Sequence, residues 1–251
     1  MIATLYSSLA IPDSCRLGKR VFKKLFHEHA TLGVTDKKAL REDIDTITWV
    51  YTLKPNTIPI HAYRDEEREY DEVAVLQVDL KTLKRTGRIA EIVHRAIPYP
   101  LVVVFAFGAT CAISLASKRF SQAEKEAIVA DDFVMTSWID LTKLSPLQQA
   151  FLDSLAITQL PQTNFSALYA ALMDRVIALD CARLSGEYRI RTTVEDRERR
   201  RQRLAKCHEL ETQITDARAM AKRQKQIHRL ADLNVEIKRL EDRLAELANE
   251  L

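Results

Sequence analysis

The apolar positions are most regular at the end of the chain. From Glu187 to Leu251 there is neither Gly nor Pro, and apolar residues recur at steps of three or four, namely Leu230, Leu233, Ile237, Leu240, Leu244, Leu247 and Leu251. An average step of about 3.5 keeps an apolar seam facing a partner helix in a left-handed coiled coil. The spacing therefore predicts a long helix over 187–251 that self-associates through this seam, and we expect a dimer.

A shorter apolar seam precedes this one in a different phase. Its members share one heptad register and are Cys207, Leu210, Ile214, Ala217 and Ala221. The seam that starts at Leu230 is two residues out of step with them, and a phase break of this kind unwinds a coiled coil or marks a bend. The helix is therefore expected either to project from the domain or to fold back on itself within residues 217–229.

Apolar runs in the first part of the chain predict β-strands. Runs rich in β-branched and aromatic residues are typical of strands, and they lie at Ile47–Leu53, Ile58–Ile60, Val73–Leu80, Leu101–Phe107, Cys111–Ala116 and Phe133–Ile139. Helical spacing over Thr82–Ala96, between two of these strands, implies a β-α-β crossover. Further helices are predicted at Arg16–His29, Lys37–Ile44, Leu147–Leu155 and Phe165–Leu184.

Together these elements predict the fold class. We expect an α/β fold with a mixed sheet of about five strands and flanking helices, followed by helices and a long C-terminal coiled coil. Residues 1–144 form the predicted α/β domain, residues 145–186 a helical extension packed on it, and residues 187–251 the long helix.

Positive charge is concentrated in two places. The net charge of +3 is too small to indicate nucleic-acid binding by itself, so local clusters matter more. One cluster lies on the predicted helix at Arg16–His29, and the other in residues 197–229, where eleven Lys or Arg face four acidic residues. The candidate phosphate contacts are Arg16, Lys19, Arg20, Lys23, Lys24, Arg199, Arg200 and Arg203. Solvated helix faces, or an antiparallel partner for the acidic end of the chain, are the commoner roles of such charges.

One short motif has catalytic potential. Asp79-Leu80-Lys81 ends a predicted strand, and Asp65 is among the acidic residues before it. A Mg²⁺-dependent nuclease of the PD-(D/E)xK kind needs clustered carboxylates for the metal and a nearby lysine. The spacing is generic, and the same residues are equally expected at the solvated end of a strand. No phosphate-binding, dinucleotide-binding or hydrolase motif is present.

The cysteines and the apolar runs bear on cellular location. The four cysteines are scattered without any CxxC pair, at Cys15, Cys111, Cys181 and Cys207. We expect reduced structural thiols of a cytoplasmic protein, with no metal site and no cofactor. The longest apolar run, Leu101–Phe107, is much shorter than the roughly 20 residues of a spanning helix, so no membrane partner is expected.

Four segments resemble a known family. Lys19–Phe26, Ile47–Ile58, Glu72–Leu80 and the Ile-Pro-Tyr-Pro element at Ile97–Pro100 are similar to the bacterial domain-of-unknown-function family 4391, over residues 1–180. The resemblance implies genes beside helicases and DNA methyltransferases in restriction-like or phage-defence loci, and it implies no catalytic residue. The favoured hypothesis is a non-enzymatic accessory or adaptor subunit, with a helicase or methyltransferase as partner and DNA contact open. The alternatives are a Mg²⁺-dependent nuclease and a structural interaction protein without DNA contact.

Overall fold

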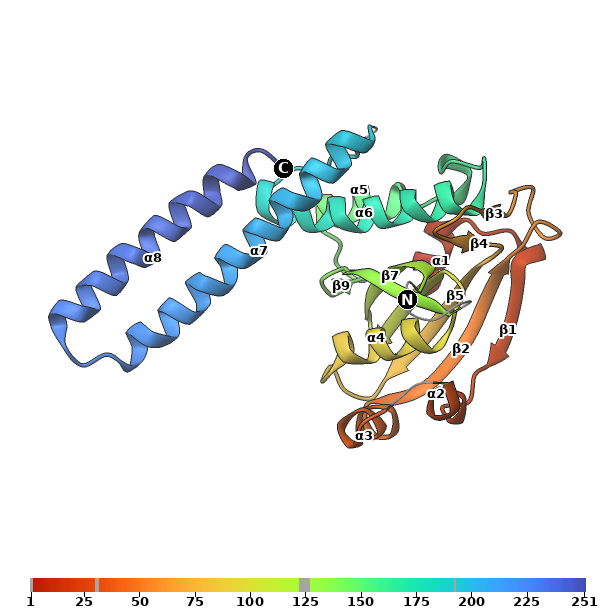
Figure 1. Ribbon diagram of the computed structural model, residues 1–251, viewed down its shortest axis with the longest axis horizontal. Coiled ribbons are helices and arrows are strands. Elements are labelled where there is room, and N and C mark those ends of the chain that lie inside the picture. The colour runs from red at the N-terminus through yellow and green to blue at the C-terminus, as the bar shows by residue number, and fades with distance from the viewer. Residues whose placement is uncertain (1, 30–31, 122–126, 192) are drawn as a thin grey trace. The chain divides into compact units, whose positions relative to one another are not determined.

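A computed structural model describes residues 2–29, 32–121, 127–191 and 193–251 (Figure 1). The chain divides into two compact units, residues 1–177 and 178–251. We call them unit 1 and unit 2 and describe each by itself.

Unit 1 is built on a mixed β-sheet. Its strands are β1 Arg16–Arg20, β2 Ile44–Leu53, β5 Val73–Leu80, β6 Leu101–Phe107, β7 Thr110–Phe120, β8 Ile128–Met135 and β9 Ile139–Asp140. Their order is β1-β2-β5-β6-β7-β8, with β9 beside β7, and β5 and β6 are the parallel pair. The predicted α/β fold with a mixed sheet is confirmed, and the sheet has seven strands where about five were expected. Two short strands, β3 Tyr63–Arg64 and β4 Glu69–Tyr70, form a separate hairpin.

The crossover predicted between two of the strands is present. Helix α4, Thr86–Ala96, connects β5 to β6, and the register of the two strands runs from Ala74 opposite Leu101 to Asp79 opposite Ala106. Together with helix α3, Val34–Glu42, it covers one face of the sheet, where Leu40, Leu76 and Ile89 are fully buried in one core. β6 and residues 73–76 of β5 are apolar on both faces because helices cover both.

The other face of the sheet packs against helices from both ends of unit 1. These are α1 Ile2–Leu9, α5 Pro146–Asp153 and the first part of α6 Phe165–Ser185, with two 3₁₀ turns, η1 Asp13–Cys15 and η2 Ile157–Gln159. Leu9, Val75 and Leu168 meet there. Ser145 caps the start of α5, where its hydroxyl accepts from the Gln148 N–H at 3.2 Å, and Pro146 is the first residue of the helix.

The helix predicted at Arg16–His29 is wrong. The segment forms the edge strand β1 and then the short helix α2, Lys24–His29. Gly18 adopts a left-handed φ of 61° inside β1, where the register with β2 shifts, and this conformation interrupts a helix. The helix predicted at Lys37–Ile44 is α3 and lies three residues earlier at its start.

Unit 2 contains a helical hairpin in place of one continuous helix. Helix α7, Val194–Arg223, and helix α8, Ile227–Ala248, are joined by a turn at residues 224–226, within the segment where the phase break predicts a bend (Figure 1). The helices are antiparallel, since Arg218 pairs with Glu241 at 2.7 Å and Arg203 with Glu250 at 2.9 Å. Arg203 and Arg218 of the basic stretch thus pair with the acidic end of the chain, one of the roles considered above.

The hairpin also accounts for the leucine seam. The seam residues of α8 from Leu230 to Leu247 are half-buried, and the seam of α7 is buried at Cys207, Leu210 and Ile214. Because the two helices pack together in one chain, the seam does not by itself require a second copy. The dimer therefore stays a prediction. Among the helices that the structure describes, none combines the length and hydropathy of a membrane span.

Candidate nucleic-acid interface

The free edge of the sheet carries positive charge. β1 pairs with β2 on one side only, and all five of its residues are exposed. Cross-strand partners share a face of a sheet, so Arg16 opposite Tyr51 and Arg20 opposite Thr48 lie on the α1 face, and Lys19 opposite Trp49 lies on the α4 face. Side chains alternate between the two faces along a strand, so β1 presents cations on both faces of the sheet.

Two lysines extend this charge around the end of the strand. Lys23 donates from Nζ to the Ile44 carbonyl at 2.5 Å. Burial lowers the pKa of Lys23, and the nearby charges of Lys81 and Arg20 lower it further, against the opposing effect of Asp45. Lys81 and Arg20 are therefore both close enough to Lys23 to repel its ammonium group.

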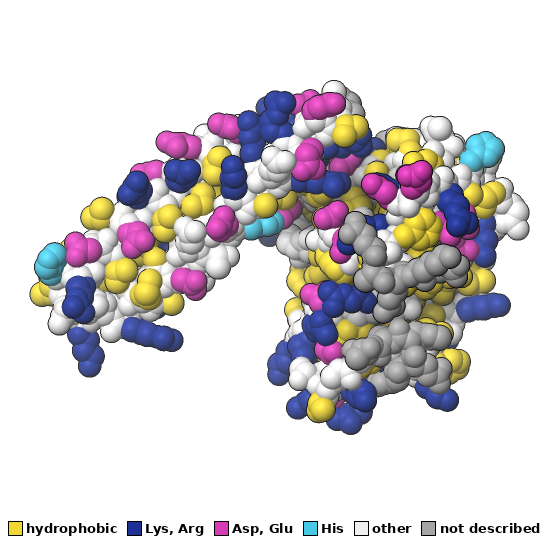
Figure 2. Space-filling model, in the orientation of Figure 1, with side chains coloured by type: hydrophobic (Ala, Val, Ile, Leu, Met, Phe, Trp, Pro, Cys, Tyr) yellow, Lys and Arg dark blue, Asp and Glu magenta, His cyan; other side chains and the backbone are white. Residues whose placement is uncertain are grey.

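We call Arg16, Lys19, Arg20, Lys23 and Lys81 the basic edge. In the described part of the chain, the three cations of β1 form no ion pair, and Lys81 reaches only Asp45, at 4.0 Å. Figure 2 shows Lys and Arg side chains over the end of unit 1 that carries α2 and α3. Phe22, which follows β1, is 70% exposed beside these cations. This surface holds positive charge that few carboxylates offset.

Asp79 and Lys81 lie at this same end of the sheet. The Asp79 carboxylate accepts from the Thr46 hydroxyl at 2.5 Å and from the Gln77 amide at 2.7 Å, and the Tyr6 hydroxyl donates to Gln77 at 2.9 Å. The Asp79 side chain is half-buried on the α1 face. It is held by neutral groups, and no arginine or lysine is paired with it among the described residues.

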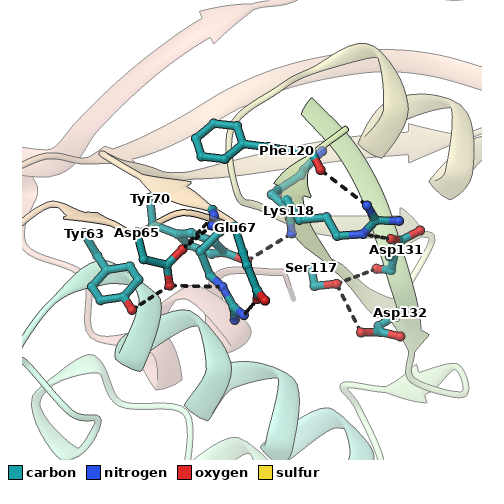
Figure 3. Close-up of polar contacts among 11 residues, drawn as sticks. Tyr63, Asp65, Glu67, Tyr70, Ser117, Lys118, Phe120, Asp131 and Asp132 are labelled. Carbon is teal, nitrogen blue, oxygen red and sulfur yellow. Dashed lines mark hydrogen bonds and ion pairs between the residues drawn. The ribbon is translucent and has the colours of Figure 1, made fainter. Parts of the chain in front are cut away.

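Asp65 lies at the opposite end of the sheet. It turns the β3–β4 hairpin, where its carboxylate accepts from the Tyr63 hydroxyl at 2.8 Å and from the Arg68 N–H at 2.7 Å (Figure 3). The Tyr63 bond is the main reason that the pKa of Asp65 is lowered. The Phe120 N–H donates to Glu67 O of this hairpin, and Phe120 is at the far end of β7 from the Asp79 end of β5. The structure does not bring Asp65 together with Asp79 and Lys81.

The described residues contain no preformed metal site. Within 2–29, 32–121, 127–191 and 193–251, no three His, Cys, Asp or Glu side chains are grouped so as to hold a metal ion. All four cysteines are free and buried. Burial raises the pKa of Cys111 and of Cys181 to about 11, so these thiols stay protonated at neutral pH.

The candidate phosphate contacts on α7 are mostly engaged within unit 2. The Arg200 side chain is buried and donates to Arg189 O at 2.7 Å. Arg203 pairs with Glu250 at 2.9 Å. Arg199 is exposed. Of these three predicted contacts, Arg199 is thus exposed, Arg203 is half-buried in an ion pair, and Arg200 is buried.

Sequence reasoning missed a buried polar cluster between α4 and β7. His94 Nε2 lies 3.1 Å from Ser114 Oγ, and both side chains are buried. Burial lowers the pKa of His94 to about 3, and the charge of Lys118 contributes. Lys118 donates from Nζ to His94 O and, at 2.7 Å, to Ile97 O, so it caps the C-terminus of α4. These contacts join residues 20 or more positions apart, so no local sequence pattern predicts them. Because the cluster is buried, it stabilises the packing of α4 against β7.

Comparisons with known proteins bear on the family of the chain. No curated protein and no solved structure matches it. A family model matches residues 9–244, which extends beyond the first 180 residues over which the resemblance was expected. The chain therefore belongs to the family described as domain of unknown function (DUF4391).

Proposed function

We propose that this protein is a non-enzymatic, cytoplasmic accessory subunit of a DNA-processing or phage-defence assembly, and that it contacts the phosphate backbone through the basic edge. The observation that carries the proposal is the row of unpaired cations along the free strand β1. Each phosphate that a Lys or Arg neutralises releases counterions, which favours binding without reading the sequence.

The spacing of the cations supports a backbone contact. Arg16 and Arg20 flank the bulge and lie opposite Tyr51 and Thr48, which are three positions apart on β2, or at most about 10 Å at 3.3 Å per residue. This span corresponds to about three base pairs of a duplex. Arg16 and Arg20 share one face of the sheet, so one nucleic-acid strand can contact both.

The partner enzyme rests on the family resemblance. A helicase or DNA methyltransferase encoded beside the gene is the proposed partner, with self-association as a further proposed property. Co-expression of this chain with the partner enzyme, followed by size-exclusion chromatography to see whether the two co-elute, tests the proposed partner. Light scattering of the isolated chain tests self-association, and a measured mass equal to one chain would contradict it.

Removing the charges of β1 is expected to weaken DNA binding. For the variant Arg16→Gln/Lys19→Gln/Arg20→Gln we expect at least about tenfold lower affinity for a labelled duplex at about 50 mM salt, because up to three phosphate contacts are lost. Fluorescence anisotropy measures the affinity. The matched control is Arg64→Gln/Arg119→Gln/Lys143→Gln, which removes the same charge from exposed sites elsewhere in unit 1. Equal losses in both variants would contradict a specific role of the basic edge.

A Mg²⁺-dependent nuclease is the second candidate. The specific observation in its favour is that Asp79 and Lys81 lie at the same end of the sheet as the basic edge, with Asp45 4.0 Å from the Lys81 ammonium. Incubation with plasmid DNA and Mg²⁺ tests it. As an accessory subunit the protein is expected to leave the plasmid intact, whereas cleavage that Asp79→Asn abolishes without loss of DNA binding would establish the nuclease instead.

A further inference from the structure

The turn of the α7–α8 hairpin is a second strongly basic surface. Four exposed cations lie there, namely Lys222 and Arg223 in the last turn of α7, Lys225 in the connection and Arg229 in the first turn of α8. No acidic residue occurs between Asp216 and Asp232. We call these four residues the hairpin tip, and Figure 2 shows Lys and Arg side chains gathered at this turn.

The charges of the hairpin tip are not neutralised within the described chain. Elsewhere on the hairpin, several cations have partners: Arg218 pairs with Glu241 at 2.7 Å, and Lys238 with Asp242 at 2.9 Å. None of the four tip residues forms an ion pair with a described carboxylate. The nearby acid, Asp232, is paired with His228 at 3.3 Å.

Helix stability explains only half of this arrangement. Lys222 and Arg223 lie at the C-terminus of α7, where cations are favourable. Lys225 and Arg229 flank the N-terminus of α8, where cations are unfavourable. α8 has no acidic residue in its first turn and no side-chain cap at Gln226. An anionic partner would offset the repulsion that the chain itself leaves uncompensated.

We propose that the hairpin tip binds the phosphate backbone of nucleic acid, as a second contact that is independent of the basic edge. Charges of one sign, fully exposed and grouped, match the dense negative charge of a duplex. Only Met220 and Ile227 are large exposed apolar side chains among them, 54% and 85% exposed, fewer than an amphipathic helix buries in a membrane surface. Two contacts on one chain increase the overall affinity by raising the effective concentration of the second.

The test compares two variants of the full chain that lose the same charge. The tip variant is Lys222→Gln/Arg223→Gln/Lys225→Gln/Arg229→Gln, and the control is Lys206→Gln/Lys238→Gln/Arg239→Gln/Arg243→Gln, at exposed sites along the hairpin. Glutamine is a good helix former, so both variants should keep the hairpin, and far-UV circular dichroism checks this. Anisotropy with a labelled duplex of about 25 base pairs is measured at several salt concentrations.

We expect the tip variant to bind the duplex about tenfold or more weakly at about 50 mM salt, with the slope of log K against log salt reduced by up to about 3.6, or about 0.9 per phosphate. The control should change affinity by less than about threefold, as expected for long-range charge alone. Equal losses in both variants would overturn the proposal. Loss of binding to vesicles of anionic lipid, with duplex binding unchanged, would also overturn it.

The basic-edge variant separates this inference from the proposed function. If the tip variant binds the duplex normally and the Arg16→Gln/Lys19→Gln/Arg20→Gln variant does not, the hairpin-tip proposal fails and the basic-edge proposal stands. If only the tip variant loses affinity, the basic-edge proposal fails and the hairpin-tip proposal stands. If the unaltered protein binds no duplex at low salt, both fail.

Discussion

Tyr169→Phe is expected to lower the free energy of unfolding of unit 1 by about 2 kcal/mol. The register between β6 and β7 ends at Val103 and Ser114, and beyond it the buried Tyr169 hydroxyl joins the two strands. The hydroxyl accepts from the Ala116 N–H at 3.0 Å and lies 2.7 Å from Leu101 O. Phe preserves the ring but leaves these buried backbone groups unpaired, and an unsatisfied buried group costs about 1 to 3 kcal/mol.

Urea denaturation measures this loss, and tryptophan fluorescence is a suitable probe because both tryptophans, Trp49 and Trp138, lie in unit 1. The control is Tyr99→Phe, at a tyrosine that is 44% exposed, where we expect a change within about 0.5 kcal/mol. Equal stability of the two variants would contradict the bridging role of the Tyr169 hydroxyl.

Acidification from pH 6.5 to pH 4.5 is expected to lower the free energy of unfolding of unit 1 by about 2 kcal/mol through His94. Burial lowers the pKa of His94 to about 3 in the folded state, against about 6.5 in the unfolded chain. Between these values the unfolded state binds a proton that the folded state does not, so stability falls as pH falls. Above pH 6.5 the His94 contribution is fully present.

The chosen pH range separates His94 from other groups. Most carboxylates remain ionised above pH 4.5. Burial lowers the pKa of Lys118 to about 7, so below pH 6.5 it is largely charged in both states. Unfolding in urea at pH 6.5, 5.5 and 4.5 is compared for the unaltered protein and His94→Gln, which retains a polar group toward Ser114. The variant should lose most of the pH dependence; an unchanged dependence would assign it to another group.

The central part of the fold follows from the sequence. The strands β5 and β6 and the helix α4 between them were predicted because their apolar patterns are long and agree with the crossover they form. The helix expected at Arg16–His29 was wrong for two reasons. Gly18 adopts a left-handed conformation that interrupts a helix, and the free edge of β2 offers hydrogen bonds to a neighbouring strand. The periodicity of apolar residues reveals neither of these. The phase break between the two seams correctly located the turn between α7 and α8.

The candidate site was predictable only in part. Exposure of Arg16, Lys19 and Arg20 did not depend on the type of element, since an edge strand exposes them as a surface helix would. The separation of Asp65 from Asp79 depends on strand order, and sequence spacing does not give strand order. The same holds for Lys118, which reaches the end of α4 from 21 positions away.

The most direct test of the central claim is the salt dependence of duplex binding by the unaltered protein. The five cations of the basic edge are expected to give measurable affinity at about 50 mM salt, with log K falling against log salt at a slope of about −3 or steeper. The variant Arg16→Gln/Lys19→Gln/Arg20→Gln should flatten that slope. Absence of binding at about 50 mM salt, where the electrostatic attraction is strong, would contradict a role in nucleic-acid binding.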